Sequence, residues 1–178
     1  MRFAAAILGI FVILVVMTSA AVYSGAYNVA ASKPANPVIA WLLHAVMVNS
    51  VEWHARRARP PADDAPGRLG FGHYREHCVG CHGGPGLPPS DLARGLNPRA
   101  PDLAGAAERW SPAQLFWIVK NGIEMTGMPA WGPSHTDQEL WQIVAFLRDL
   151  PTLSAEQYQA MDRQHAHSHA HSHAEPGE

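Results

Sequence analysis

The stretch REHCVGCHGGPG, residues 75–86, contains the only two cysteines of the 178-residue chain, Cys78 and Cys81, and His82 follows directly. Cysteines this close together serve three chemistries: a structural zinc site, a dithiol redox couple, or covalent attachment of haem c. With two thiols in total, no framework of several disulfides is possible, and their short separation disfavours a single structural bridge. The rest of the sequence has to distinguish the three chemistries.

The surrounding sequence favours haem. A structural zinc ion needs four ligands, commonly as two Cys or His pairs at set spacing, and no second pair is evident. A thioredoxin-like dithiol expects a βαβ context, whereas the pattern around the motif is helical. The motif Cys-x-x-Cys-His attaches haem c and explains every residue of the cluster. We therefore predict one covalent haem c, bound through thioethers to Cys78 and Cys81, with His82 as an axial iron ligand.

The N-terminus predicts export. Residues Phe3–Val22 are almost wholly apolar, and no charged residue lies between Arg2 and Lys33. Twenty helical residues span about 30 Å, the thickness of one hydrocarbon core. A cleaved signal peptide with a site near residues 18–20 is the alternative, but the apolar cores of signal peptides usually have about 7–15 residues. We expect a retained membrane anchor, in residues 1–33.

Residues 34–59 predict one amphipathic helix, with Asn36 as its cap and Pro37 in its first turn. Two positions for this helix remain open. It lies in the membrane interface with its arginines near the headgroups, or it docks on the C-terminal domain. We favour the interface, and we expect His44 and His54 to be ordinary polar-face residues.

A Pro-rich linker, residues 60–67, precedes a compact domain at residues 68–163. Two helices in it are well signalled: one from Ser111 to Gly122 and one from Thr136 to Pro151, each with a capping-box pattern. The prolines of residues 83–110 predict a long structured loop. Candidate core residues before the cysteine motif are Leu69, Phe71 and Tyr74. The near balance of 13 Lys+Arg and 15 Asp+Glu excludes a general affinity for nucleic acid.

Residues 68–151 resemble a class I monohaem cytochrome c, of the type found in cytochrome c subunits of bacterial terminal oxidases. The matching features are CVGCH after a helix, the loop GLNPRAPDL, the segment VKNGIEMTGMPAWG and the closing helix LWQIVAFLRDLP. The resemblance implies an all-α fold in which about three to four helices surround one haem. Here that domain would follow an N-terminal transmembrane helix and an amphipathic helix.

The resemblance also implies two contacts at the iron. A backbone carbonyl near Pro98 or Pro101 would accept a hydrogen bond from His82. The sixth iron ligand would lie in a Gly-Met-Pro loop, which only TGMPAWG fits, and this nominates Met128. The stiffness that Gly127 and Pro129 give this loop supports Met128 independently. The other candidates in the domain are Met125, Met161, His73, His77 and His135.

Ligation by His and Met raises the reduction potential and occupies both axial positions of the iron. The sequence thus predicts an electron carrier, not an enzyme, with the membrane and respiratory-chain redox proteins as partners. The expected location is the bacterial inner membrane, with the cytochrome domain in the periplasm. The alternatives are a haem sensor or catalytic haem protein with a labile sixth ligand, and a metal-handling protein.

The metal-handling alternative rests on residues 164–178, which we expect to be a disordered tail. The tail contains HAHSHAHSH, and neutral imidazoles suit Cu(II), Ni(II) and Zn(II). Its candidate ligands are His165, His167, His169, His171 and His173. An inert low-complexity tail is the other interpretation.

Overall fold

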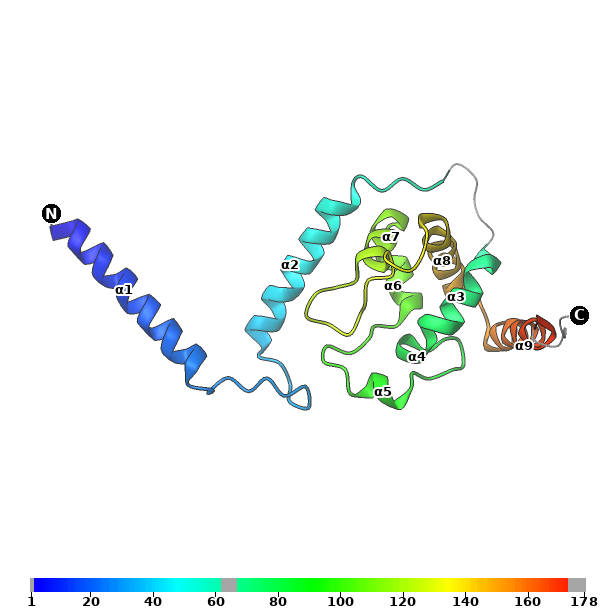
Figure 1. Ribbon diagram of the computed structural model, residues 1–178, viewed down its shortest axis with the longest axis horizontal. Helices are drawn as coiled ribbons and strands as arrows, with labels where there is room; N and C mark the ends of the chain where they lie inside the picture. The colour runs from blue at the N-terminus through cyan, green and yellow to red at the C-terminus, as the bar shows by residue number, and fades with distance from the viewer. Residues whose placement is uncertain (1, 62–66, 173–178) are drawn as a thin grey trace, which may run out of the picture. The chain divides into compact units, whose positions relative to one another are not determined.

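The computed structural model describes residues 2–61 and 67–172, with the backbone alone for residues 167–172. This part of the chain is helical, and an isolated bridge between Gly84 and Leu87 is its only extended pairing. The predicted all-α class is confirmed. The helices (Figure 1) are α1 (Arg2–Tyr23), α2 (Pro37–Ala55), α3 (Gly70–His77), α4 (Val79–His82), α5 (Asp91–Arg94), α6 (Leu103–Arg109), α7 (Pro112–Asn121), α8 (Asp137–Asp149) and α9 (Ala155–Ser172), with 3-10 turns η1 (Gly67–Leu69) and η2 (Leu150–Thr152).

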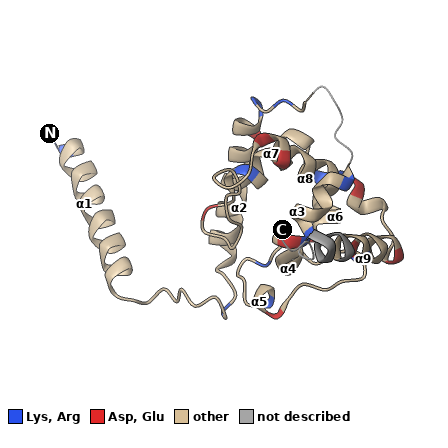
Figure 2. Cartoon of the chain, turned by 45° about the vertical axis from the view of Figure 1, so that its right-hand side comes forward, with Lys and Arg blue, Asp and Glu red and all other residues tan. Residues whose placement is uncertain are grey.

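The chain divides into two compact units, Met1–Pro34 and Ala35–Glu178. In the first unit, α1 is long and apolar enough to cross a membrane, judged by length and composition. Figure 2 shows that α1 carries no charged side chain after Arg2.

The core of the second unit forms where α3 packs on α8. The ring of Phe146 from α8 lies between two aromatic residues of α3, at centroid distances of 5.5 Å to Phe71 and 5.0 Å to Tyr74. The backbones approach closely because α3 begins with Gly70, where a Cβ atom would lie 2.0 Å from the carbonyl oxygen of Gln142. Among the predicted core residues, Phe71 and Tyr74 are buried, but Leu69 is 55% exposed. The prediction that Leu69 is a core residue was wrong. Leu69 lies in η1, before the start of α3, whose apolar residues pack on α8.

Both well-signalled helices begin and end as the sequence predicts. Ser111 and Gln114 form a reciprocal capping box at the start of α7, and Thr136 and Glu139 do the same for α8. Such caps contribute about 1 kcal/mol each. The apolar face of α8 is buried, with Leu140, Ile143, Val144 and Leu147 each no more than 3% exposed.

Helix α2 docks with its C-terminal half on α7. Val51 and Ala55 are buried, and the ring of His54 stacks on Trp117 with centroids 5.7 Å apart. The favoured prediction, a helix lying free of the domain in the membrane interface, was wrong for this half. The burial of Val51 and Ala55 and the stacking of His54 on Trp117 stabilise this docking. The first half of α2 differs, because its large apolar side chains are exposed, among them Val38, Trp41, Leu42 and Val46.

Two further segments differ from the prediction. The Pro-rich segment 83–110 contains two short helices, α5 and α6; Asp102 caps α6 by accepting from the N–H groups of Ala104 and Gly105. Helix α9 extends to Ser172, beyond residue 164, where we predicted disorder to begin. Its start is anchored by Tyr158, which is 2% exposed and packs on Phe71, and no Pro or Gly follows before Pro176.

Candidate haem-binding site

The cysteine motif lies at the junction of α3 and α4. Cys78 ends α3 and begins α4, and its carbonyl oxygen accepts hydrogen bonds from the N–H groups of Cys81 at 3.1 Å and His82 at 2.9 Å. Residues three apart on a helical turn lie on one side of it, so the two thiols share a face. Cys78 is buried and Cys81 is half-buried, and both are free thiols.

The environment of Cys78 disfavours dithiol redox chemistry. Burial, with a smaller contribution from Cys81, raises the pKa of the Cys78 thiol to about 12. Dithiol oxidoreductases rely instead on a thiolate stabilised by a lowered pKa. The neutral, buried form suits a cysteine whose sulfur ends in a thioether.

His82 is oriented by the segment before α6. Its Nδ1 lies 2.9 Å from the carbonyl oxygen of Pro101. A carbonyl can only accept, so Nδ1 carries the proton and Nε2 is left with a lone pair for a metal. Burial lowers the pKa of His82, and the hydrogen bond to Pro101 partly opposes this. The imidazole is thus held in its neutral form, and the predicted carbonyl is that of Pro101.

Two further hydrogen bonds fix the motif in place. The hydroxyl of Tyr74 donates to the carbonyl oxygen of Gly83 at 2.7 Å, directly after His82. The N–H of Ser90 donates to the carbonyl oxygen of Gly80 at 2.9 Å, so the Pro-rich segment returns to the motif. These contacts restrain the motif from both sides.

Met128 lies in a compact loop between α7 and α8. The N–H of Met128 donates to Thr126 Oγ1 at 3.1 Å, and the carbonyl oxygen of Met128 accepts from the N–H of Ile123 at 3.2 Å. Thr126 Oγ1 donates in turn to the carbonyl oxygen of Ile123 at 2.7 Å. This loop is therefore closed on itself by its own hydrogen bonds, and Met128 is half-buried within it.

The other methionines are placed differently. Met125 lies at the turn of the same loop with φ of 59° and is 76% exposed. Met161 packs against the hydrophobic core from α9. Of the three, Met128 alone combines partial burial with a place in the loop that the sequence nominates.

The segment that contains Pro101, the partner of His82, contacts the loop that contains Met128. Leu96, from the segment before Pro101, packs on Gly127, where an added Cβ would lie 2.7 Å from Leu96 Cδ2. A side chain at position 127 would require the end of the Leu96 side chain to move. The contact joins the loops on which the two candidate iron ligands depend.

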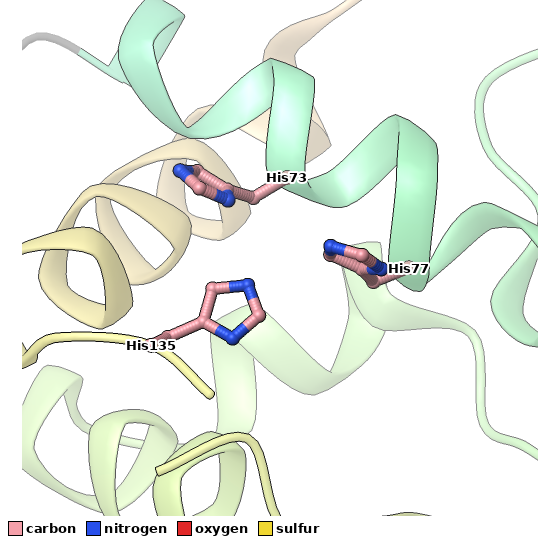
Figure 3. A group of neighbouring side chains, drawn as sticks. All are labelled: His73, His77 and His135. Atoms are coloured by element: carbon pink, nitrogen blue, oxygen red, sulfur yellow. The ribbon is translucent and has the colours of Figure 1, made fainter. Parts of the chain in front are cut away.

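The three histidines weighed as alternative iron ligands gather elsewhere. One imidazole nitrogen from each of His73, His77 and His135 lies within 4.8 Å of the others (Figure 3). Sequence reasoning did not foresee this grouping, although the spacing of His73 and His77 by one helical turn was a signal for it. Trp131 is half-buried, and the centroid of its ring lies 4.7 Å from that of His77.

The chemistry of the donor set fits haem c. Two thiols on one helical turn can hold a porphyrin through thioethers, a neutral imidazole can bind iron through Nε2, and Met128 offers a thioether sulfur in a closed loop.

One known family matches the part of the chain that contains these residues. The family model of cytochrome c oxidase, cbb3-type, subunit III matches residues 65–147. No curated protein and no solved structure matches the chain. The matched residues contain the cysteine motif, the loop of Met128 and most of α8. Residues 65–147 are therefore similar to the cytochrome c domain of this family, and this likeness supports a class I haem c cytochrome that transfers electrons.

Proposed function

We propose that the chain is a membrane-anchored monohaem cytochrome that carries single electrons between respiratory-chain components on the periplasmic side of the bacterial inner membrane. The hydrogen bond from His82 Nδ1 to the Pro101 carbonyl carries this proposal, because it presents a neutral imidazole for iron directly beside two free thiols. The family match supports a role with a terminal oxidase.

Each residue of the proposed site has one task. Haem c, when bound, supplies a one-electron couple of its iron. Cys78 and Cys81 would hold it through thioethers, and His82 would be one iron ligand. Met128 would be the other iron ligand, and a thioether ligand favours the reduced iron. Because the hydrogen bonds of both ligand segments are internal to the protein, these segments need little rearrangement when the charge changes.

A sensor or catalytic haem protein is the competing proposal, and it needs a sixth ligand that leaves the iron. The closed loop of residues 123–128 supports a ligand that stays. We therefore expect the reduced full-length protein to resist carbon monoxide at neutral pH, while an excess of a small one-electron oxidant oxidises it quickly. Absorption spectroscopy measures both. Rapid and complete carbon monoxide binding by the unmodified protein would favour the sensor.

The anchor proposal makes a separate prediction. If α1 is retained, the mature protein begins near Met1 and stays in the membrane fraction after a high-salt wash, because about 20 apolar residues bind a bilayer without help from charge. Removal of residues 1–33 behind a foreign signal peptide should release most of the holoprotein into solution. N-terminal sequencing and fractionation measure the outcome. Native protein that begins near Ala21 would instead indicate a cleaved signal peptide.

We also propose that the His-rich segment binds Cu(II), Ni(II) or Zn(II). Among its histidines, His165 is half-buried beside Phe71, with ring centroids 5.8 Å apart. His167, His169 and His171 belong to α9, and His173 lies outside the described residues. The support for metal binding is the number of imidazoles in this short sequence.

A further inference from the structure

A second cluster of metal-ligating side chains lies on the surface of the cytochrome domain. His73 and His77 belong to α3, and His135 comes from the segment just before α8. In Figure 3 the ring of His135 faces the space between the two rings of α3. These side chains come from parts of the sequence about 60 residues apart, so the fold assembles the cluster.

The geometry suits one shared ion. Residues four apart on a helix project from the same face, as His73 and His77 do. The ring centroid of His135 lies 5.2 Å from that of His73 and 5.1 Å from that of His77. A tetrahedral zinc site with Zn–N distances of about 2.0–2.1 Å has ligand nitrogens about 3.4 Å apart. Nitrogens that already lie within 4.8 Å need only small side-chain rotations to reach it.

Neighbouring groups orient two of the rings. Nδ1 of His135 lies 2.9 Å from Ser134 Oγ, and this contact leaves Nε2 of His135 for an ion. The ring of Trp131 packs beside two of the histidines, with its centroid 4.7 Å from that of His77 and 5.5 Å from that of His135. A metal-bound histidine usually forms a hydrogen bond through its other nitrogen, as His135 can with Ser134. His73 and His135 are half-buried and His77 is exposed, so the cluster is open to an ion from solvent.

The charges around the cluster favour a cation. Glu76 lies 3.7 Å from Nε2 of His77. Hydrogen bonds from Thr136 lower the pKa of Glu139. Glu139 therefore stays ionised close to the cluster at neutral pH. The nearby cations are engaged elsewhere, since Arg75 pairs with Asp162 and Lys120 with Asp137.

We propose that His73, His77 and His135 bind one divalent late transition-metal ion, with zinc as the reference ion and water completing its coordination. Imidazole ligands suit Zn(II), Ni(II) and Cu(II), and three of them leave one tetrahedral position for water. The three ligands of this site are not among the histidines of the proposed tail site, and they do not include the haem ligands.

A bound ion would join two parts of the fold that matter for the haem site. Helix α3 leads directly into Cys78, and His135 follows Met128 by seven residues. An ion held by both segments fastens the end of the Met128 loop to the helix that carries the cysteine motif. Because such an ion binds the folded protein alone, it also raises the thermal midpoint.

Isothermal titration calorimetry of the full-length holoprotein with ZnCl₂ tests the proposal. The parent protein carries His165, His167, His169, His171 and His173 all changed to Ala, so that tail sites do not contribute. We expect one Zn(II) per chain, and a loss of affinity of more than about tenfold in His135→Ala and in His73→Ala. The matched control is His44→Ala, which removes an exposed imidazole of α2 and should leave the affinity unchanged.

A second measurement separates loss of binding from loss of folding. Without metal, His135→Ala should keep the haem spectrum and the thermal midpoint of the parent. Zn(II) should raise that midpoint by several degrees in the parent and not in the variant. No stoichiometric binding in the parent, or equal affinity in the parent and His135→Ala, would overturn the proposal. If the protein carried no haem, the proposed function would be wrong, but the calorimetric test of the zinc site would still be valid.

Discussion

Replacing both Cys78 and Cys81 by alanine is expected to abolish covalent haem completely. Unmodified protein should keep its haem-staining band on a reducing, denaturing gel, because thioether bonds survive both treatments. The double variant should show no band at the same protein load, since His82 and Met128 can bind iron only by coordination, which denaturation breaks. This is an all-or-none effect, and the gel measures it directly.

The matched control lies inside the same motif. Gly80 is exposed, and an added Cβ there would meet nothing within 4 Å. Gly80→Ala should therefore keep the haem band, although it changes the same short segment. If the unmodified protein lost its haem on denaturation, the proposed covalent attachment would be wrong. If Gly80→Ala also lost its haem, any change in the motif would prevent attachment, and the result of the double variant could not be assigned to the thiols.

The sequence was most informative where local chemistry decides the structure. The caps at Ser111 and Thr136 depend on residues three positions away, so both helices could be placed correctly. The haem motif is equally local, because Cys78, Cys81 and His82 occupy one helical turn. The carbonyl partner of His82 was narrowed to the region of Pro98 and Pro101, and only the folded chain selects Pro101.

Tertiary packing decided the features that the sequence did not predict. The apolar and basic residues of α2 suit a membrane surface as well as a protein surface, and the stacking of His54 on Trp117 is a long-range contact. Leu69 is apolar and adjacent to a core helix, yet η1 leaves it exposed. The grouping of His135 with α3 likewise depends on how α8 crosses α3. No local pattern encodes these three outcomes.

Met128→Ala is expected to have the second large effect, this time on the iron. The variant should lose the thioether ligand, so its reduction potential should fall by a sizeable part of the span of about 0.8 V that axial ligands set. The reduced variant should also bind carbon monoxide, because its sixth position is open. Redox titration and absorption spectra measure the two changes. Covalent haem should remain, since both cysteines are intact.

Met125→Ala is the matched control for this prediction. It changes the same residue type three positions away, in the same loop, but Met125 is 76% exposed and holds none of the loop's hydrogen bonds through its side chain. Its potential and its resistance to carbon monoxide should equal those of the unmodified protein. Met128 differs because its own N–H and carbonyl group close the loop, which holds the backbone of Met128 in place. If Met125→Ala opened the iron to carbon monoxide and Met128→Ala did not, the ligand would be Met125, and the loop would have to rearrange on haem binding. If neither variant bound carbon monoxide, the sixth ligand would lie outside this loop.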